Sequence, residues 1–223
     1  CLKSRKIIDQ GCKAIAARMK AKPTDGHIIA RALNATALLA SGDPAYLPII
    51  RKQAELLCQY NQSRGVRTWQ YGYVNTFLAE YVLATGDRTE VYAGLKRITK
   101  MIVDGQSVVG SWGHGFVDKD TGRLGGYGMM NAPGIPLAYS LVPARKAGLR
   151  SQSLDDAIAK SETFLKFYVG KGAIPYGDHA PWIQTHCDNG KNEMAAVLFD
   201  SLRNPKVTEF FSRMSVASHG AER

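Results

Sequence analysis

The chain has 223 residues, of which 45% are hydrophobic and 22% charged, and its formal net charge is +10. This length suffices for one domain with a large core, and its four cysteines lack the C-x-x-C spacing of a zinc knuckle and the pattern of a disulfide framework. No apolar run reaches the roughly 18 residues of a membrane span, and basic residues mixed with acidic ones along several segments argue against a nucleic-acid partner.

Helical segments of two kinds alternate along the chain. Ile8, Cys12, Ile15 and Met19 form one apolar stripe at helical spacing, which predicts an amphipathic outer helix. Residues 27–40 are apolar or small on nearly every side, which is typical of a buried inner helix. The alternation continues as striped over 46–60, buried over 71–84, striped over 91–102, buried over 128–144, striped over 154–168, buried over 193–202 and striped over 207–214. The sequence therefore predicts an all-α fold of stacked helical hairpins.

Short polar turns follow the inner helices. Gly42 and Gly86 lie 44 residues apart, and an aspartate follows each of them. Glycine suits the left-handed residue that ends a helix, and aspartate suits the N-cap of the next one. With Pro44 as a first helical residue, these turns predict a repeat of about the length of a helical hairpin.

The opposite connections, from an outer helix to the next inner one, contain glycine, aromatic residues and histidine. After a short first connection at 23–27 they are long, covering 62–73, 105–128 and 170–192. In a stack of hairpins all such connections lie on one rim, and long loops inside a compact domain are uncommon unless they are functional. The sequence therefore predicts a polar and aromatic rim pocket for a polymer or small-molecule ligand.

One connection carries a repeat motif. Gln106, Gly110 and Trp112 have the form Q-x-x-x-G-x-W, which resembles the repeat of squalene and terpenoid cyclases and of protein prenyltransferase β-subunits. The fold of that superfamily is an α/α toroid. The acidic D-x-D-D box of the cyclases is lacking here, because Asp120 is followed by Thr121.

The rim segments also resemble those of an uncharacterised bacterial toroid family often found beside PDZ-like domains. Residues 176–179 and 189–192 carry this likeness. Because the chain begins at Cys1 rather than Met, we expect residues 1–223 to be a single domain of helical-hairpin repeats within a longer chain that carries further domains. A bacterial periplasmic or secreted location is favoured over a cytoplasmic one.

The last long connection holds the densest set of reactive side chains. Asp178, His179 and His186 are candidates for acid and base catalysis. The alternative is that this stretch caps a helix and satisfies buried backbone groups. The substrate-binding candidates in the same stretch are Trp182 as an aromatic wall, Lys191 as a positive charge at a helix N-terminus, and Asn189 and Asn192 as orienting amides.

The preceding connection supplies His114, Asp118 and Asp120 as further catalytic candidates, and Tyr127 and Asn131 as ligand contacts. The alternative for residues 118–122 is a simple turn. Trp69, Tyr71 and Tyr73 are candidates for aromatic walls that stack on sugar rings, or for core residues.

Three functions remain open at this point, and with them whether the protein is an enzyme. The first is a hydrolase or lyase acting on a glycan or cell-wall polymer, with Asp118 or Asp120 facing Asp178 as its carboxylate pair. The second is a non-catalytic module that binds a polymer or peptide and lacks a perturbed titratable pair. The third is a terpenoid-type enzyme with a deep apolar cavity. No cofactor is expected, and zinc is the one metal that the histidines and Cys187 would suit.

Overall fold

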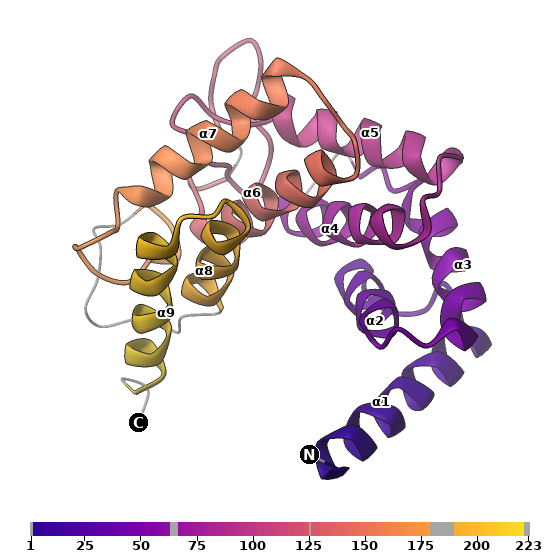
Figure 1. The fold of residues 1–223 in the computed structure, drawn as a ribbon. Coiled ribbons are helices and arrows are strands. Elements are labelled where there is room, and N and C mark those ends of the chain that lie inside the picture. The colour runs from indigo at the N-terminus through magenta and orange to yellow at the C-terminus, as the bar shows by residue number, and fades with distance from the viewer. Residues whose placement is uncertain (1, 63–66, 125, 179–189, 221–223) are drawn as a thin grey trace.

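A computed structural model describes residues 2–62, 67–124, 126–178 and 190–220 (Figure 1). Over these ranges the chain is all-α, as predicted, and its β-structure consists of isolated bridges such as Val117–Leu124 and Met130–Gly177. The helices are α1 (Leu2–Ala21), α2 (Ile28–Ala40), η1 (Pro44–Tyr46), α3 (Leu47–Leu57), α4 (Arg67–Thr85), α5 (Glu90–Asp104), α6 (Asn131–Lys146), α7 (Gln152–Lys166), α8 (Lys191–Ser201) and α9 (Pro205–Gly220).

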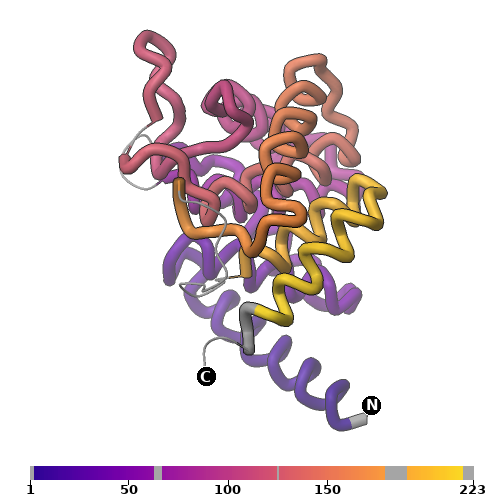
Figure 2. The backbone as a smooth tube through the Cα atoms, turned by 90° about the vertical axis from the view of Figure 1, so that its left-hand side faces the viewer, coloured from indigo at the N-terminus to yellow at the C-terminus, as the bar shows by residue number. Residues whose placement is uncertain are grey.

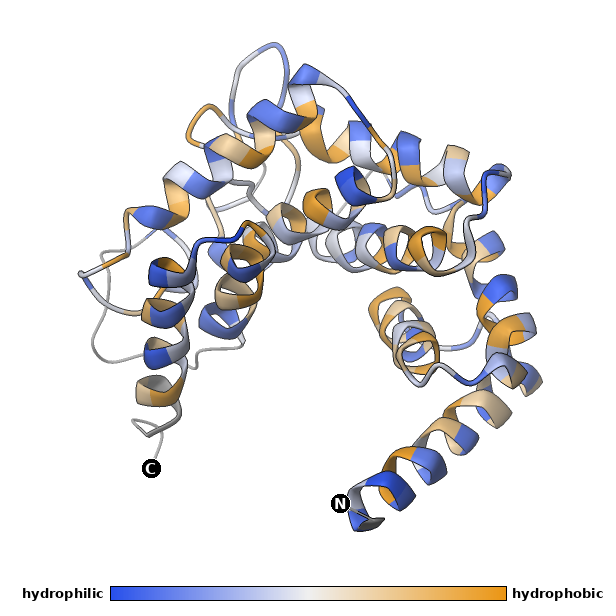
Figure 3. Ribbon diagram, viewed as in Figure 1, coloured by the Kyte–Doolittle hydropathy of each residue, from blue (hydrophilic) through white to orange (hydrophobic). Residues whose placement is uncertain are grey.

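The helices form two layers that follow an open arc (Figure 1). The inner helices α2, α4, α6 and α8 pack each against the next, and α3, α5, α7 and α9 each pack on the inner helix that precedes them. Hydrophilic and hydrophobic residues alternate along the outer helices, as an amphipathic helix requires (Figure 3). The predicted alternation of buried and striped helices is confirmed, since α4 and α6 are buried over most of their surface.

The first half of α1 is more exposed than the sequence predicts. Ile8 was expected to begin its buried stripe, but Ile8 is 58% exposed, whereas Cys12 and Met19 are buried. The first half of α1 extends beyond the helices on which its second half packs (Figure 1). The amphipathic pattern therefore marks the contact face only where a neighbouring helix is present.

The short turns use the glycines that the sequence indicates. Gly42 and Gly86 both have φ of +70°, in the left-handed region where a side chain is disfavoured. Asp43 is the N-cap of η1 and accepts a hydrogen bond from the backbone of Ala45. The second predicted N-cap is wrong by two residues, because Thr89 holds that position in α5, and Asp87 instead accepts from the backbone N–H and hydroxyl of Thr89.

The repeat motif joins two successive outer helices. The Gln106 side chain, just after α5, donates to the carbonyls of Gly110 and Ala157 and to the hydroxyl of Ser161, and the last two belong to α7. Trp112 is fully buried and its ring N–H donates to the Ile102 carbonyl. The motif is therefore a structural tie at the base of the 105–130 connection.

Candidate functional site at the long connections

The connection that follows α5 is held against the start of α4. The buried Thr68 hydroxyl donates to the carbonyls of Gly113 and His114, at 2.7 and 2.9 Å. The indole N–H of Trp69 donates to Nδ1 of His114 at 3.4 Å. Because Nδ1 accepts this bond, the neutral His114 carries its proton on Nε2.

The connection that follows α7 is held against the start of α6. Met130 and Gly177 form an isolated bridge, and the backbone N–H of Asn131 donates to the Tyr176 carbonyl at 2.9 Å. The Asn131 side chain is fully buried and its amide faces the carbonyls of Pro175 and Gly177, at 2.9 and 3.1 Å. Asn131, a predicted ligand contact, therefore fastens this connection to α6.

Four rings, from the start of α4 and from two connections, gather beside these contacts. The rings of Trp69 and Tyr176 lie 6.5 Å apart between centroids, and those of His114 and Tyr127 lie 5.9 Å apart. Tyr127 is 89% exposed and Tyr176 36% exposed, while Trp69 and His114 are partly buried. We call Trp69, His114, Tyr127 and Tyr176 the aromatic group. The start of α4 and residues 170–178 of the fourth connection thus lie on the same rim, as predicted, and residues 105–124 and 170–178 both lie toward the left of Figure 2.

Gly126 allows the 105–130 connection to pass close to His114. Its φ is +89°, and a Cβ placed on it would lie 3.1 Å from Cβ and 3.3 Å from Cδ2 of His114. A side chain at position 126 would therefore be strained and would crowd the imidazole.

The acidic candidates of this connection form a turn. Oδ1 of Asp118 accepts hydrogen bonds from the backbone of Asp120, at 3.1 Å, and from the backbone and hydroxyl of Thr121, both at 2.8 Å. These donors, led by the Thr121 N–H, lower the pKa of Asp118. Asp118, Asp120 and Asp178 are all exposed. Residues 118–122 therefore form a turn, and a lowered pKa does not suit Asp118 to the role of a proton donor.

The two tyrosines of α4 occupy different environments. Tyr71 is fully buried, its ring lies 4.8 Å from that of Tyr60 and 5.3 Å from that of Phe116, and its hydroxyl donates to the Gln62 carbonyl. Tyr73 is partly buried. Burial raises the pKa of both phenols. Tyr71 packs in the core, and its ring has no face open to a ligand.

The start of α8 is also buried. Lys191 is 3% exposed and Asn192 is fully buried, with its side-chain oxygen accepting from the backbone N–H of Ile174 at 3.2 Å. Asn192 therefore binds the 167–190 connection as Asn131 does. Of the remaining candidates, His179, Trp182, His186 and Asn189 lie outside the described residues.

The described ranges contain no cluster of three or more His, Cys, Asp or Glu side chains placed to hold a metal ion. Among the same residues, Cys12 and Cys58 are free thiols. No helix in this part of the chain combines the length and the apolar character needed to cross a bilayer.

Comparison with known proteins places this fold in a family. Residues 4–223 match the family described as a domain of unknown function, DUF6288. The chain belongs to this family. No curated protein and no solved structure matches the chain. What this DUF6288 domain does must therefore be argued from its own residues.

Several residues that build the rim have no recognisable pattern in the sequence. Thr68, Tyr176 and Met130 act through contacts with segments at least 45 residues away in the chain. Tyr176 lies between Pro175 and Gly177, two residues that favour turns, and this setting was the one available signal that it stands in a loop. Thr68 looks like any other polar residue near the start of a helix.

Proposed function

We propose that this domain is a non-catalytic binding module for a glycan or cell-wall polymer, and that the aromatic group is its contact surface. The exposure of Tyr127 carries the proposal. A tyrosine that is 89% exposed and backed by His114 presents a large apolar ring to solvent, and such rings suit stacking on the apolar faces of sugars. Tyr176 extends the surface onto the connection that follows α7, and Trp69 extends it onto the start of α4.

The state of the carboxylates favours binding over hydrolysis. A glycosidase needs one carboxyl group that holds its proton near neutral pH and a second one within about 5 to 10 Å. The pKa of Asp118 is lowered instead of raised, and its Oδ1 already accepts three hydrogen bonds from its own turn. This carboxylate stabilises the tip of the connection.

The architecture supports the same proposal. The two-layer arc of inner and outer helices is what one segment of an α/α toroid would look like, in agreement with the Q-x-x-x-G-x-W motif at Gln106. A rigid stack that carries its long loops on one rim is a suitable scaffold for an extended ligand. We take the arc as part of such a toroid.

Co-sedimentation with insoluble polymers tests the proposal. Purified peptidoglycan, chitin and cellulose would be offered to the wild type and to Tyr127→Ala and Tyr176→Ala. We expect at least one polymer to retain the wild type and to bind each variant about tenfold more weakly, which corresponds to roughly 1.4 kcal/mol. Tyr92→Ala is the matched control, because Tyr92 is a partly exposed tyrosine at the start of α5, at the opposite end of the helices.

Two results would contradict binding through the aromatic group. One is that the polymer retains Tyr127→Ala and Tyr176→Ala to the same extent as the control Tyr92→Ala. The other is catalytic release of soluble sugar fragments from the retained polymer, which would make the domain a hydrolase or lyase. Release that survives Asp118→Asn would further show that Asp118 is not one of the catalytic residues.

A further inference from the structure

A second polar site lies at the other end of the arc, where α1, α2 and α3 meet. Arg31 of α2 donates through Nε to the side-chain oxygen of Gln53 at 3.2 Å. The other end of the Gln53 amide donates to the Pro23 carbonyl at 2.6 Å, and Gln53 is 1% exposed. Since the carbonyl of Pro23 accepts only from the amide nitrogen, the orientation of Gln53 is fixed and it aligns the guanidinium of Arg31.

One terminal nitrogen of Arg31 has no protein acceptor. Nη2 is buried and makes no hydrogen bond within the part of the chain that the structure describes. Burial also lowers the pKa of Arg31. A buried cationic donor without an acceptor is costly, because the desolvation of the group is not offset. Folded proteins rarely leave such a donor in place unless a water or a ligand completes it.

Arg31 lines a small cavity that has an excess of positively charged side chains. The cavity has a volume of about 60 Å³, room for a few waters or one small polyatomic ion. Its polar lining consists of Arg18, Lys22, Asp25, Arg31, Asn34 and Gln53. The single carboxylate in this lining, that of Asp25, lies 3.7 Å from Arg18 and is about half exposed, so Arg31 and Lys22 keep their charge for another partner.

We propose that this cavity is an oxyanion site, in which Nη2 of Arg31 donates to a carboxylate or phosphate group and Lys22 and Arg18 complement its charge. Gln53 is a positioning residue. The oxyanion is either a free ion or an acidic group on a larger ligand. The site shares no residue with the aromatic group, so either proposal can fail while the other stands.

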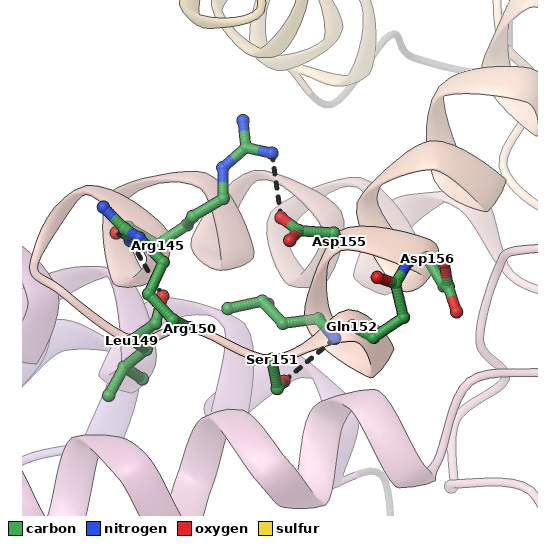
Figure 4. A network of polar contacts seen from close by, with 8 residues as sticks. Arg145, Leu149, Arg150, Ser151, Gln152, Asp155 and Asp156 are labelled. Carbon is green, nitrogen blue, oxygen red and sulfur yellow. Dashed lines mark hydrogen bonds and ion pairs between the residues drawn. The ribbon is translucent and has the colours of Figure 1, made fainter.

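A larger cation-lined cavity between α5 and α7 is the rival location. It has a volume of about 480 Å³, and Lys96, Lys100 and Arg150 line it. There, however, Arg150 donates to the carbonyls of Arg145 and Leu149, and Lys100 pairs with Asp104. Figure 4 shows the surroundings of Arg150, with Arg145 facing Asp155. Lys96 makes no such contact, but its side chain is exposed to solvent. Water therefore satisfies its N–H donors, whereas Nη2 of Arg31 is buried without an acceptor.

Thermal unfolding in inorganic phosphate tests the site. Phosphate would be titrated at constant ionic strength, with chloride replacing it. We expect the midpoint of the wild type to rise and to saturate with a dissociation constant on the order of 1 mM, as suits a ligand of five non-hydrogen atoms. Arg31→Met should lose at least nine-tenths of this phosphate-dependent shift. Lys22→Met should weaken the affinity several-fold, and it covers the case in which Arg31→Met does not fold.

Lys96→Met and Arg213→Met are the controls, the first for the rival cavity and the second for a surface arginine. Both should keep the wild-type shift. A wild type that responds to phosphate and chloride alike, or a shift that Lys96→Met abolishes and Arg31→Met retains, would overturn the proposal. Competition between phosphate and polygalacturonate, compared with a neutral glycan, then distinguishes an acidic polymer from a free ion as the source of the oxyanion.

Discussion

The two ends of the helical stack are built on different principles. At one end the chain turns within a few residues, and the bonds are local, such as Asp43 to Ala45 and Ser151 to Leu154. At the other end the connections are long, and side chains distant in the sequence hold them, such as Thr68 to Gly113 and Asn131 to Pro175. The short turns therefore set the register of the hairpins, whereas the long connections depend on the assembled stack for their shape.

This difference predicts that the largest losses of stability come from the ties of the long connections. Trp112→Ala removes a fully buried indole and its hydrogen bond to Ile102, and we expect the free energy of unfolding to fall by about 3 to 5 kcal/mol. Asp43→Ala, which removes a local cap, should cost about 1 kcal/mol. Urea denaturation of both variants measures the contrast, and equal losses would contradict it.

A pair of glycines in one connection sharpens the comparison. Gly110 has φ of +92°, and a Cβ there would lie 2.4 Å from the Lys160 carbonyl oxygen of α7, whereas Gly122 has φ of +68° with open space around it. Gly122→Ala should therefore lower the free energy of unfolding only through the cost of a left-handed backbone for alanine, about 1 kcal/mol. Gly110→Ala adds a clash that must move α7, and we expect it to cost at least about 2 kcal/mol more. Chemical denaturation checks this, and similar losses would show that α7 adjusts freely.

The same contrast explains what the sequence could predict. Periodicity located the helices, because the burial of one face repeats along a helix whatever the neighbour is. The roles of Gly42 and Asp43 could be predicted because this turn is held by contacts among its own residues. Tyr71, near the start of α4, and Tyr176, in the connection after α7, are each followed by a glycine. Tyr71 is nevertheless fully buried, whereas Tyr176 is 36% exposed. Only the packing of distant segments separates them, and no local pattern records it.

The smallest effect that we predict concerns the tip of the 105–130 connection, where a long connection contains a local turn. The backbone N–H of Thr121 and then its hydroxyl lower the pKa of Asp118. Thr121→Val removes the hydroxyl and keeps the N–H, so the pKa of Asp118 should rise part of the way toward the ordinary value of about 3.9. Thr121→Ser keeps both donors and should leave the pKa where it is. Carbon-13 NMR titration of the Asp118 carboxyl group measures all three proteins.

The sign of the stability effect follows from the direction of that shift. A carboxyl group whose pKa is lower in the folded than in the unfolded chain stabilises the fold at pH values above the unfolded pKa. The contribution is lost as the pH falls through the folded pKa, so the turn should loosen only below about pH 4. Because Asp118 is fully exposed and bonds only within its own turn, this loosening should stay local, with the amide signals of residues 118–122 shifting while those of α5 and α7 hold. A simultaneous shift of the α7 signals would contradict this prediction. It would mean that the turn is coupled to the helical stack, so that bonds within the turn and contacts with distant segments act together in this connection.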